Sequence, residues 1–203
     1  MKTLLLTGFE PFLGHPINPT EQIVKELDGK ETGDYQIKGK LLPVDFAEAQ
    51  GQFVSYMNDL QHDAVISLGL AAGRECITPE RVAINIRDGE PDNKGNAHQD
   101  ALIEENGPAA YFSTLPIRAM VEELNAAGLP AKISNTAGTY LCNNIMYSML
   151  HELESRNMTV PAGFIHVPAS HDLVVKGSRA MPSWSQADLT KAIEIMIGVL
   201  AGP

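Results

Sequence analysis

Residues 131–155, AKISNTAGTYLCNNIMYSMLHELES, hold the pattern from which the fold of the chain is predicted. Segment 131–134 predicts a short strand, and the small and polar residues 135–139 predict a sharp turn. From Cys142 to about Ser155, apolar residues recur at the three- and four-residue spacing of a buried helix face. The pattern therefore places Cys142 at the N-terminus of a helix that follows a strand.

That position of Cys142 suits a nucleophile. The unpaired N–H groups and the positive end of the helix dipole favour a thiolate over a thiol, and the same N–H groups can bind an oxyanion. A free cysteine is, however, more often a small buried apolar side chain. Cys142 becomes a credible nucleophile only if the chain also supplies a histidine and a third group.

Length and composition limit the classes of protein to which the chain can belong. Its 203 residues predict one domain, residues 1–203, and the net charge of −10 argues against a nucleic-acid partner. The apolar run at the N-terminus is too short for a signal peptide, and no run is long enough to cross a bilayer. Two cysteines form no disulfide framework, which fits a reducing compartment. We expect a cytoplasmic protein without a membrane partner.

Strand and helix patterns alternate along the whole chain. The apolar runs that predict strands are 3–7, 35–44, 64–68, 81–86 and 162–167. The amphipathic patterns that predict helices begin at Pro19, Asp45, Pro116, Cys142 and Ser185, and they end near residues 28, 60, 127, 155 and 200. Residues 8–19, 87–108 and 169–183 predict loops. The predicted fold is a single-domain three-layer α/β/α sandwich with a mixed, mostly parallel sheet, as in phosphorylases and hydrolases of this architecture.

The loops that follow the strands are expected to meet at one edge of that sheet. His166 ends the last predicted strand, so it can lie beside Cys142 and act as its acid–base partner. Glu80 is the best candidate for the carboxylate that would orient the imidazole. A core histidine and a solvated Glu80 paired with Arg81 are the ordinary alternatives. Spacing does not exclude three other carboxylates, those of Asp88, Asp92 and Asp172.

Several segments resemble the pyroglutamyl peptidases (pyrrolidone-carboxylate peptidases), which are cysteine exopeptidases that remove an N-terminal pyroglutamyl residue. The resemblance runs from Lys2 to about Val167. The matching segments, in the order found in the family, are TGFEPF at 7–12, TPERVAIN at 78–85, PDN at 91–93 with GN at 95–96, GPAAYFSTLP at 107–116, TAGTYLCN at 136–143 and GFIHVP at 163–168.

The resemblance implies roles for seven residues of this chain. Cys142 matches the nucleophile, His166 the general acid–base and Glu80 the group that orients and charges the histidine. The substrate-binding residues that it implies are Phe9, Phe12, Leu70 and Asn143, of which the two phenylalanines would hold the flat, uncharged pyrrolidone ring.

The chain departs from the family pattern in three places. Residues 89–93 are one residue shorter than the usual segment and lack its arginine, for which Arg87 is a possible substitute. The glycine-rich loop 69–74 differs at its second and fourth positions. Residues 169–172 replace the usual continuation after the histidine strand, so the rim of the pocket is expected to differ.

We predict a hydrolase that forms a thioester with its substrate and needs no metal or organic cofactor, because two cysteines without nearby ligands make a zinc site improbable. Its partners would be peptides with N-terminal pyroglutamate, and the resemblance implies a homo-oligomer, a dimer or a tetramer. Two alternatives remain open. One is a nucleoside phosphorylase-like transferase that uses loop 69–74 as a phosphate site, and the other is a small-molecule-binding or redox-sensing protein. Cys76 is expected to be a structural thiol.

Overall fold

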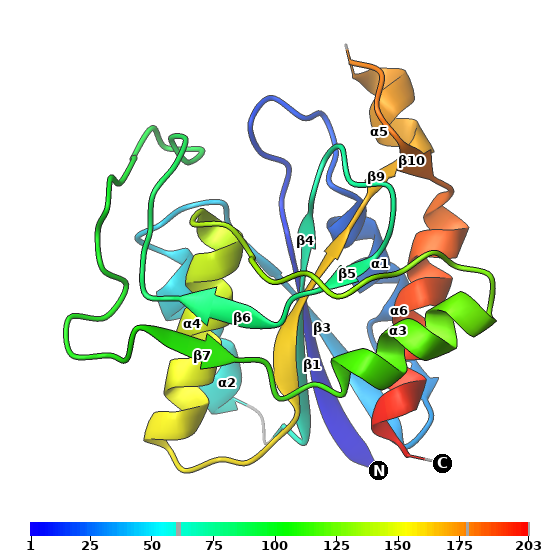
Figure 1. Ribbon diagram of the computed structural model, residues 1–203, viewed down its shortest axis with the longest axis horizontal. Helices are drawn as coiled ribbons and strands as arrows, with labels where there is room; N and C mark the ends of the chain where they lie inside the picture. The colour runs from blue at the N-terminus through cyan, green and yellow to red at the C-terminus, as the bar shows by residue number, and fades with distance from the viewer. Residues whose placement is uncertain (60–61, 178, 203) are drawn as a thin grey trace.

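A computed structural model describes residues 1–59, 62–177 and 179–202 of the chain. A six-stranded sheet forms its centre (Figure 1). In the order of the sheet, the strands are β2 (Glu31–Thr32), β3 (Tyr35–Leu42), β1 (Lys2–Phe9), β4 (Ala64–Leu70), β8 (Ala162–Val167) and β5 (Thr78–Pro79). The four central strands are parallel to one another, whereas the edge strands β2 and β5 run antiparallel to their neighbours. The predicted mixed, mostly parallel sheet is confirmed.

Helices cover both faces of the sheet and complete the three predicted layers. The helices are α1 (Pro19–Leu27), α3 (Ile117–Ala126) and α6 (Gln186–Leu200) on one face, and α2 (Ala49–Asp59) and α4 (Leu141–Ser155) on the other (Figure 1). Within the described ranges, no helix is long and apolar enough to cross a membrane.

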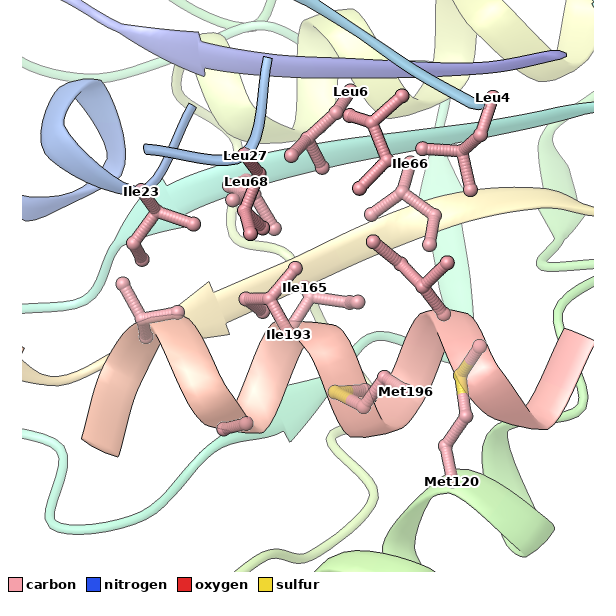
Figure 2. Packing of buried hydrophobic residues seen from close by; sticks show 14 of the residues in the cluster. Leu4, Leu6, Ile23, Leu27, Ile66, Leu68, Met120, Ile165, Ile193 and Met196 are labelled. Atoms are coloured by element: carbon pink, nitrogen blue, oxygen red, sulfur yellow. The ribbon is translucent and has the colours of Figure 1, made fainter. Parts of the chain in front are cut away.

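Alternating side chains of the central strands build the two cores between these layers. Leu4 and Leu6 of β1 point to one face, where they pack with Ile193 of α6 and its neighbours (Figure 2). Leu5 points to the other face and packs in the cluster that contains Ile145 of α4. Because β1, β4 and β8 are buried on both faces, their sequences show continuous apolar runs rather than alternation.

Local signals in the sequence place the first helix. The side chain of Asn18 caps α1 by accepting a hydrogen bond from the N–H of Thr20. Glu21, in the first turn of α1, pairs with Lys25 one turn later. A Cβ at Gly8 would lie 2.8 Å from the carbonyl oxygen of Thr20, so the absence of a side chain lets α1 pack directly on β1.

The predictions for the shorter elements were partly wrong. Residues 131–134 form only isolated bridges with the segment that contains β5, and they extend the sheet edge without becoming a regular strand. The strand predicted at 81–86 is β6 (Val82–Ile84), which pairs with β7 (Ala110–Phe112) in a separate hairpin. The predicted loop 169–183 contains three short elements: β9 (Ala169–Ser170), α5 (His171–Lys176) and β10 (Ser183–Trp184). Strands of two residues and a helix of only six residues are too short to produce a readable period in the sequence.

The helix predicted from Asp45 begins later than expected. Oδ1 of Asp45 accepts hydrogen bonds from the N–H groups of Ala47 and Glu48, so this turn precedes α2, which starts at Ala49. The predicted end of that helix, residue 60, lies outside the described residues.

Candidate active site

The carboxyl ends of β1, β4 and β8 lie together at the upper edge of the sheet in Figure 1, and α4 begins beside them. His166 is the penultimate residue of β8 and Cys142 is the second residue of α4. The parallel order of the strands therefore brings together two residues that are 24 positions apart in the sequence (166 minus 142).

Gly69 of β4 makes room for the thiol. It lies directly opposite His166 in the register of β4 and β8. A Cβ at Gly69 would come within 2.8 Å of Sγ of Cys142 and within 2.7 Å of the ring of Phe164. Only a residue without a side chain fits there, because real Cβ atoms do not approach other heavy atoms so closely. The thiol of Cys142 thus packs against the sheet beside the histidine.

The imidazole of His166 is held by Glu80. Its Nδ1 lies 2.7 Å from Oε1 of Glu80, and the two side chains are buried, with 0% of the Glu80 residue exposed. Thr78 of β5 lies opposite His166 in the antiparallel register. This pairing brings Glu80, two positions later, to the imidazole. Since Nδ1 is bound to the carboxylate, Nε2 is the ring atom left for proton exchange with the thiol.

The other three candidate carboxylates lie elsewhere. Asp92 is buried, but it accepts hydrogen bonds from backbone N–H groups, among them that of Phe46. Asp88 accepts from the N–H of Asp100, and Asp172 lies in the first turn of α5. Glu80 is the only one of the four candidates that is hydrogen-bonded to His166.

Arg74 is the cationic partner of Glu80. Its Nη1 donates at 2.7 Å to Oε1 of Glu80, the atom that is also bound to Nδ1 of His166, and it contacts Oγ1 of Thr78. The guanidinium of Arg81, for which pairing with Glu80 was the ordinary alternative, instead donates to Oδ1 of Asn135. This engagement of Arg74 with a buried carboxylate argues against the loop 69–74 as a phosphate site.

The environment sets the protonation state of each group. Burial favours an uncharged carboxyl at Glu80, but the hydrogen bond and the charge interaction with His166, together with the bond from Arg74, hold its pKa below the ordinary value. Burial lowers the pKa of His166, and Glu80 offsets only part of that effect. The resting site therefore holds an ionised carboxylate and a neutral imidazole.

Cys142 differs from the prediction made from its position in the helix. Burial of the thiol and the nearby negative charge of Glu80 raise its pKa to about 12, although Arg74 and the backbone N–H of Cys142 act in the opposite direction. Loss of hydration therefore opposes the preference for the thiolate that the start of the helix favours. The thiol must therefore lose its proton during the reaction.

A small apolar pocket lies beside the thiol. It is lined by Phe9, Phe12, Val44, Leu70, Tyr140, Leu141 and Cys142. The ring of Tyr140 stacks on that of Phe12, with a distance of 6.3 Å between the centroids. The predicted residues Phe9, Phe12 and Leu70 thus lie next to Cys142. Val44, Tyr140 and Leu141 were not predicted to line the pocket. For Tyr140 there was one signal in the sequence, since it is an aromatic residue two positions before Cys142.

Asn143 does not line this pocket. Its side chain is fully buried, accepts a hydrogen bond from the N–H of Ile84 and donates to the carbonyl groups of Ile84 and Ile86. These bonds fasten the start of α4 to the β6 segment. The side chain of Asn143 therefore fixes the position of the neighbouring Cys142 and has no group free to bind a ligand.

The segment that differs from the family pattern does not line the pocket but packs against Tyr140, which does. Nε of Arg87, the suggested substitute for the missing arginine, donates to the carbonyl of Leu102. Gly89 packs against the ring of Tyr140, since a Cβ there would lie 3.4 Å from it. The segment is fixed to the loop after β1, because Oε1 of Glu10 accepts a hydrogen bond from the side chain of Asn93.

Among the described residues, no group of three histidine, cysteine, aspartate or glutamate side chains is arranged to hold a metal ion. The second cysteine, Cys76, is free and buried, and it does not line the pocket.

Comparison with known proteins places this geometry in a family. Residues 1–202 match the family model described as pyroglutamyl peptidase. The chain is 52% identical over 200 residues to a pyrrolidone-carboxylate peptidase of Oceanobacillus iheyensis, covering 98% of this chain and 100% of the relative. It is 51% identical to the enzyme of that name from Halalkalibacterium halodurans, with 96% of each chain covered.

Solved structures agree with these sequence matches. The pyrrolidone carboxyl peptidase of Thermococcus litoralis superposes with a TM-score of 0.95 at 44% identity, covering 98% of this chain and 93% of that one. A variant of the Pyrococcus furiosus enzyme superposes with a TM-score of 0.94 at 42% identity, covering 98% and 97%.

The raised pKa of Cys142 can be tested by alkylation. In a Cys76→Ser background, we expect the rate of reaction of Cys142 with iodoacetamide to rise continuously from about pH 6 to about pH 10, because only the thiolate reacts and the thiol stays neutral over most of this range. The same protein with Cys142→Ser is the control for background labelling. A rate that is constant between about pH 5 and 8 would show a resting thiolate–imidazolium pair and contradict the assignment.

Proposed function

The chain belongs to the pyroglutamyl peptidase family, and from this membership we propose how its own residues remove an N-terminal pyroglutamyl residue from a peptide. The observation that carries the proposal is the buried contact of 2.7 Å between Glu80 and His166, next to a thiol that packs on Gly69. A nucleophile, a base and a group that orients the base are the three parts that acyl transfer needs.

In the first half of the reaction, Sγ of Cys142 attacks the carbonyl carbon of the pyroglutamyl residue while Nε2 of His166 takes the thiol proton. The N–H groups at the start of α4 have no partners within the helix, and they are placed to stabilise the oxyanion. The carbon–nitrogen bond then breaks, and His166 gives its proton to the departing amine. The acyl group remains on Cys142 as a thioester.

In the second half, His166 takes a proton from water, whose oxygen attacks the thioester carbonyl. The carbon–sulfur bond breaks, pyroglutamate leaves, and the proton returns to Sγ. Throughout, Glu80 holds Nδ1 of His166 in the protonated form and stabilises the imidazolium that appears twice in each cycle.

The apolar pocket beside Cys142 is the proposed site for the lactam ring. A pyrrolidone ring is flat and uncharged, so its contact with Phe9, Phe12, Leu70 and Tyr140 would leave no buried charge unpaired. A free N-terminal amine is charged and strongly hydrated, and the pocket offers it no carboxylate. This contrast supports selectivity for pyroglutamate over proline.

Further proposals concern the whole chain. The two cores share one sheet, which supports a single peptidase domain over residues 1–203, and the two free thiols support a cytoplasmic location.

We also propose a homo-oligomer, a dimer or a tetramer, because Phe112 is 70% exposed beside an apolar groove. Light scattering at micromolar concentration should give a mass of at least twice 22.0 kDa, whereas a monomer would contradict this proposal.

The proposed nucleophile is tested with a chromogenic amide of pyroglutamate. We expect Cys142→Ala to lower kcat/KM about 10³-fold or more, because the thioester can no longer form. The matched variant Cys76→Ala should keep nearly full activity, since Cys76 does not line the pocket. The wild-type protein should not release the amine from the same amide of free proline. Turnover that survives in Cys142→Ala but is lost in Cys76→Ala would reverse the assignment.

The proposed lactam pocket is tested by truncating one of its rings. Phe12→Ala should raise KM about tenfold or more and change kcat less, because a ring that contacts bound substrate contributes roughly 1–3 kcal/mol of apolar contact. Val175→Ala truncates an apolar side chain that is exposed and lies outside the pocket, and it should leave the kinetics unchanged. An unchanged KM for the folded Phe12→Ala protein would place the substrate elsewhere.

A further inference from the structure

Arg74 has no part in the reaction steps proposed above, although its guanidinium is bound to Glu80. It follows β4 at the end of the loop 69–74, and its guanidinium reaches the segment after β5. There it donates to Oε1 of Glu80, the same atom that is bound to Nδ1 of His166. One carboxylate oxygen is therefore shared by a permanent cation and by the base of the active site.

The second contact of Arg74 makes this geometry rigid. Nη1 also contacts Oγ1 of Thr78, the residue that lies opposite His166 in the sheet. The guanidinium thus links the loop after β4, the edge strand β5 and the carboxylate. Because a guanidinium is planar and always charged, it fixes the direction of its hydrogen bonds better than an ammonium group does.

We propose that Arg74 is a positioning residue of this active site, which holds the Glu80 carboxylate in the orientation that His166 requires and balances its buried negative charge. The inference rests on the proposed roles of Cys142, His166 and Glu80. Arg74 itself need not touch the substrate, since it acts through the carboxylate.

This role predicts how the protonation of His166 responds to the loss of the arginine. The charged or titratable groups that face the imidazole are Glu80 from the segment after β5, Arg74 from the loop after β4 and Cys142 from α4. Glu80 favours the imidazolium, whereas Arg74 disfavours it. Without the cation, the carboxylate would act on His166 unopposed, and the pKa of His166 would rise.

The test is the dependence of kcat/KM on pH for a pyroglutamyl amide. This substrate has no ionisable amine, so the acidic limb of the profile reports the base of the free enzyme. In Arg74→Met, we expect that limb to move to higher pH by about half a unit or more, and kcat/KM at pH 7 to fall about tenfold. Arg74→Lys keeps the charge and should keep the limb near its wild-type position.

Arg81→Met is the matched control. It removes the same charge from the residue next to Glu80, but its guanidinium is bound to Asn135, so the limb should not move. If Arg74→Met does not fold, Arg74→Gln, which is also neutral but can donate a hydrogen bond, should show the same shift with a smaller loss of activity. A folded neutral variant whose acidic limb stays at the wild-type pH would overturn the inference. If the proposed function itself is wrong, a different result will show it: Cys142→Ala will retain turnover of the pyroglutamyl amide.

Discussion

The site depends on the burial of one charge. The carboxylate of Glu80 has no exposed surface, and a buried anion without partners would cost several kcal/mol. Two donors offset part of this cost, because His166 and Arg74 both bind Oε1, whereas Oε2 is buried without a hydrogen-bond partner among the described residues. The backbone completes the arrangement, since the N–H of Glu80 donates to the carbonyl of Phe164 and keeps this segment against β8. The short edge strand β5 is thus the element that delivers the carboxylate to the histidine, and the same bonds stabilise the edge of the sheet.

A second constraint is space at the end of β4. Alternation along the parallel strands directs Gly69 and His166 to the face covered by α4, next to the apolar side chains that pack this helix on the sheet. Any side chain at Gly69 would meet the thiol or Phe164. The glycine therefore sets how deeply the start of α4 can approach the sheet, and so where Cys142 lies relative to the imidazole. Here the packing of the core and the geometry of the site are the same interaction.

The sequence predicted those parts of the molecule that long or repeated patterns encode. The buried strands and the five long helices were predicted because apolar periodicity extends over many residues. Cys142 and His166 were predicted because one lies at the start of a long helix and the other near the end of a buried strand. Glu80 could not be separated from Asp88, Asp92 and Asp172, because the pairing of β5 with β8 joins residues 86 positions apart. The partner of Glu80 was missed for the same reason: Arg74 reaches it by folding back, whereas Arg81 is its neighbour only in sequence. The burial that raises the pKa of Cys142 was not predicted either, since it depends on contacts that no local pattern reveals.

A neutral resting thiol has a consequence for how the enzyme works. The apolar surroundings that raise the pKa of Cys142 also form the proposed lactam pocket, so the substrate completes the low-dielectric environment in which the proton must move. Attack is favourable only where the new negative charge on the carbonyl oxygen is met by N–H groups of α4 and the proton is accepted by His166. When no substrate is bound, there is no carbonyl group for the thiol of Cys142 to attack, and the thiol stays protonated. The reactivity of Cys142 toward a carbonyl group is thereby linked to occupancy of the pocket by substrate.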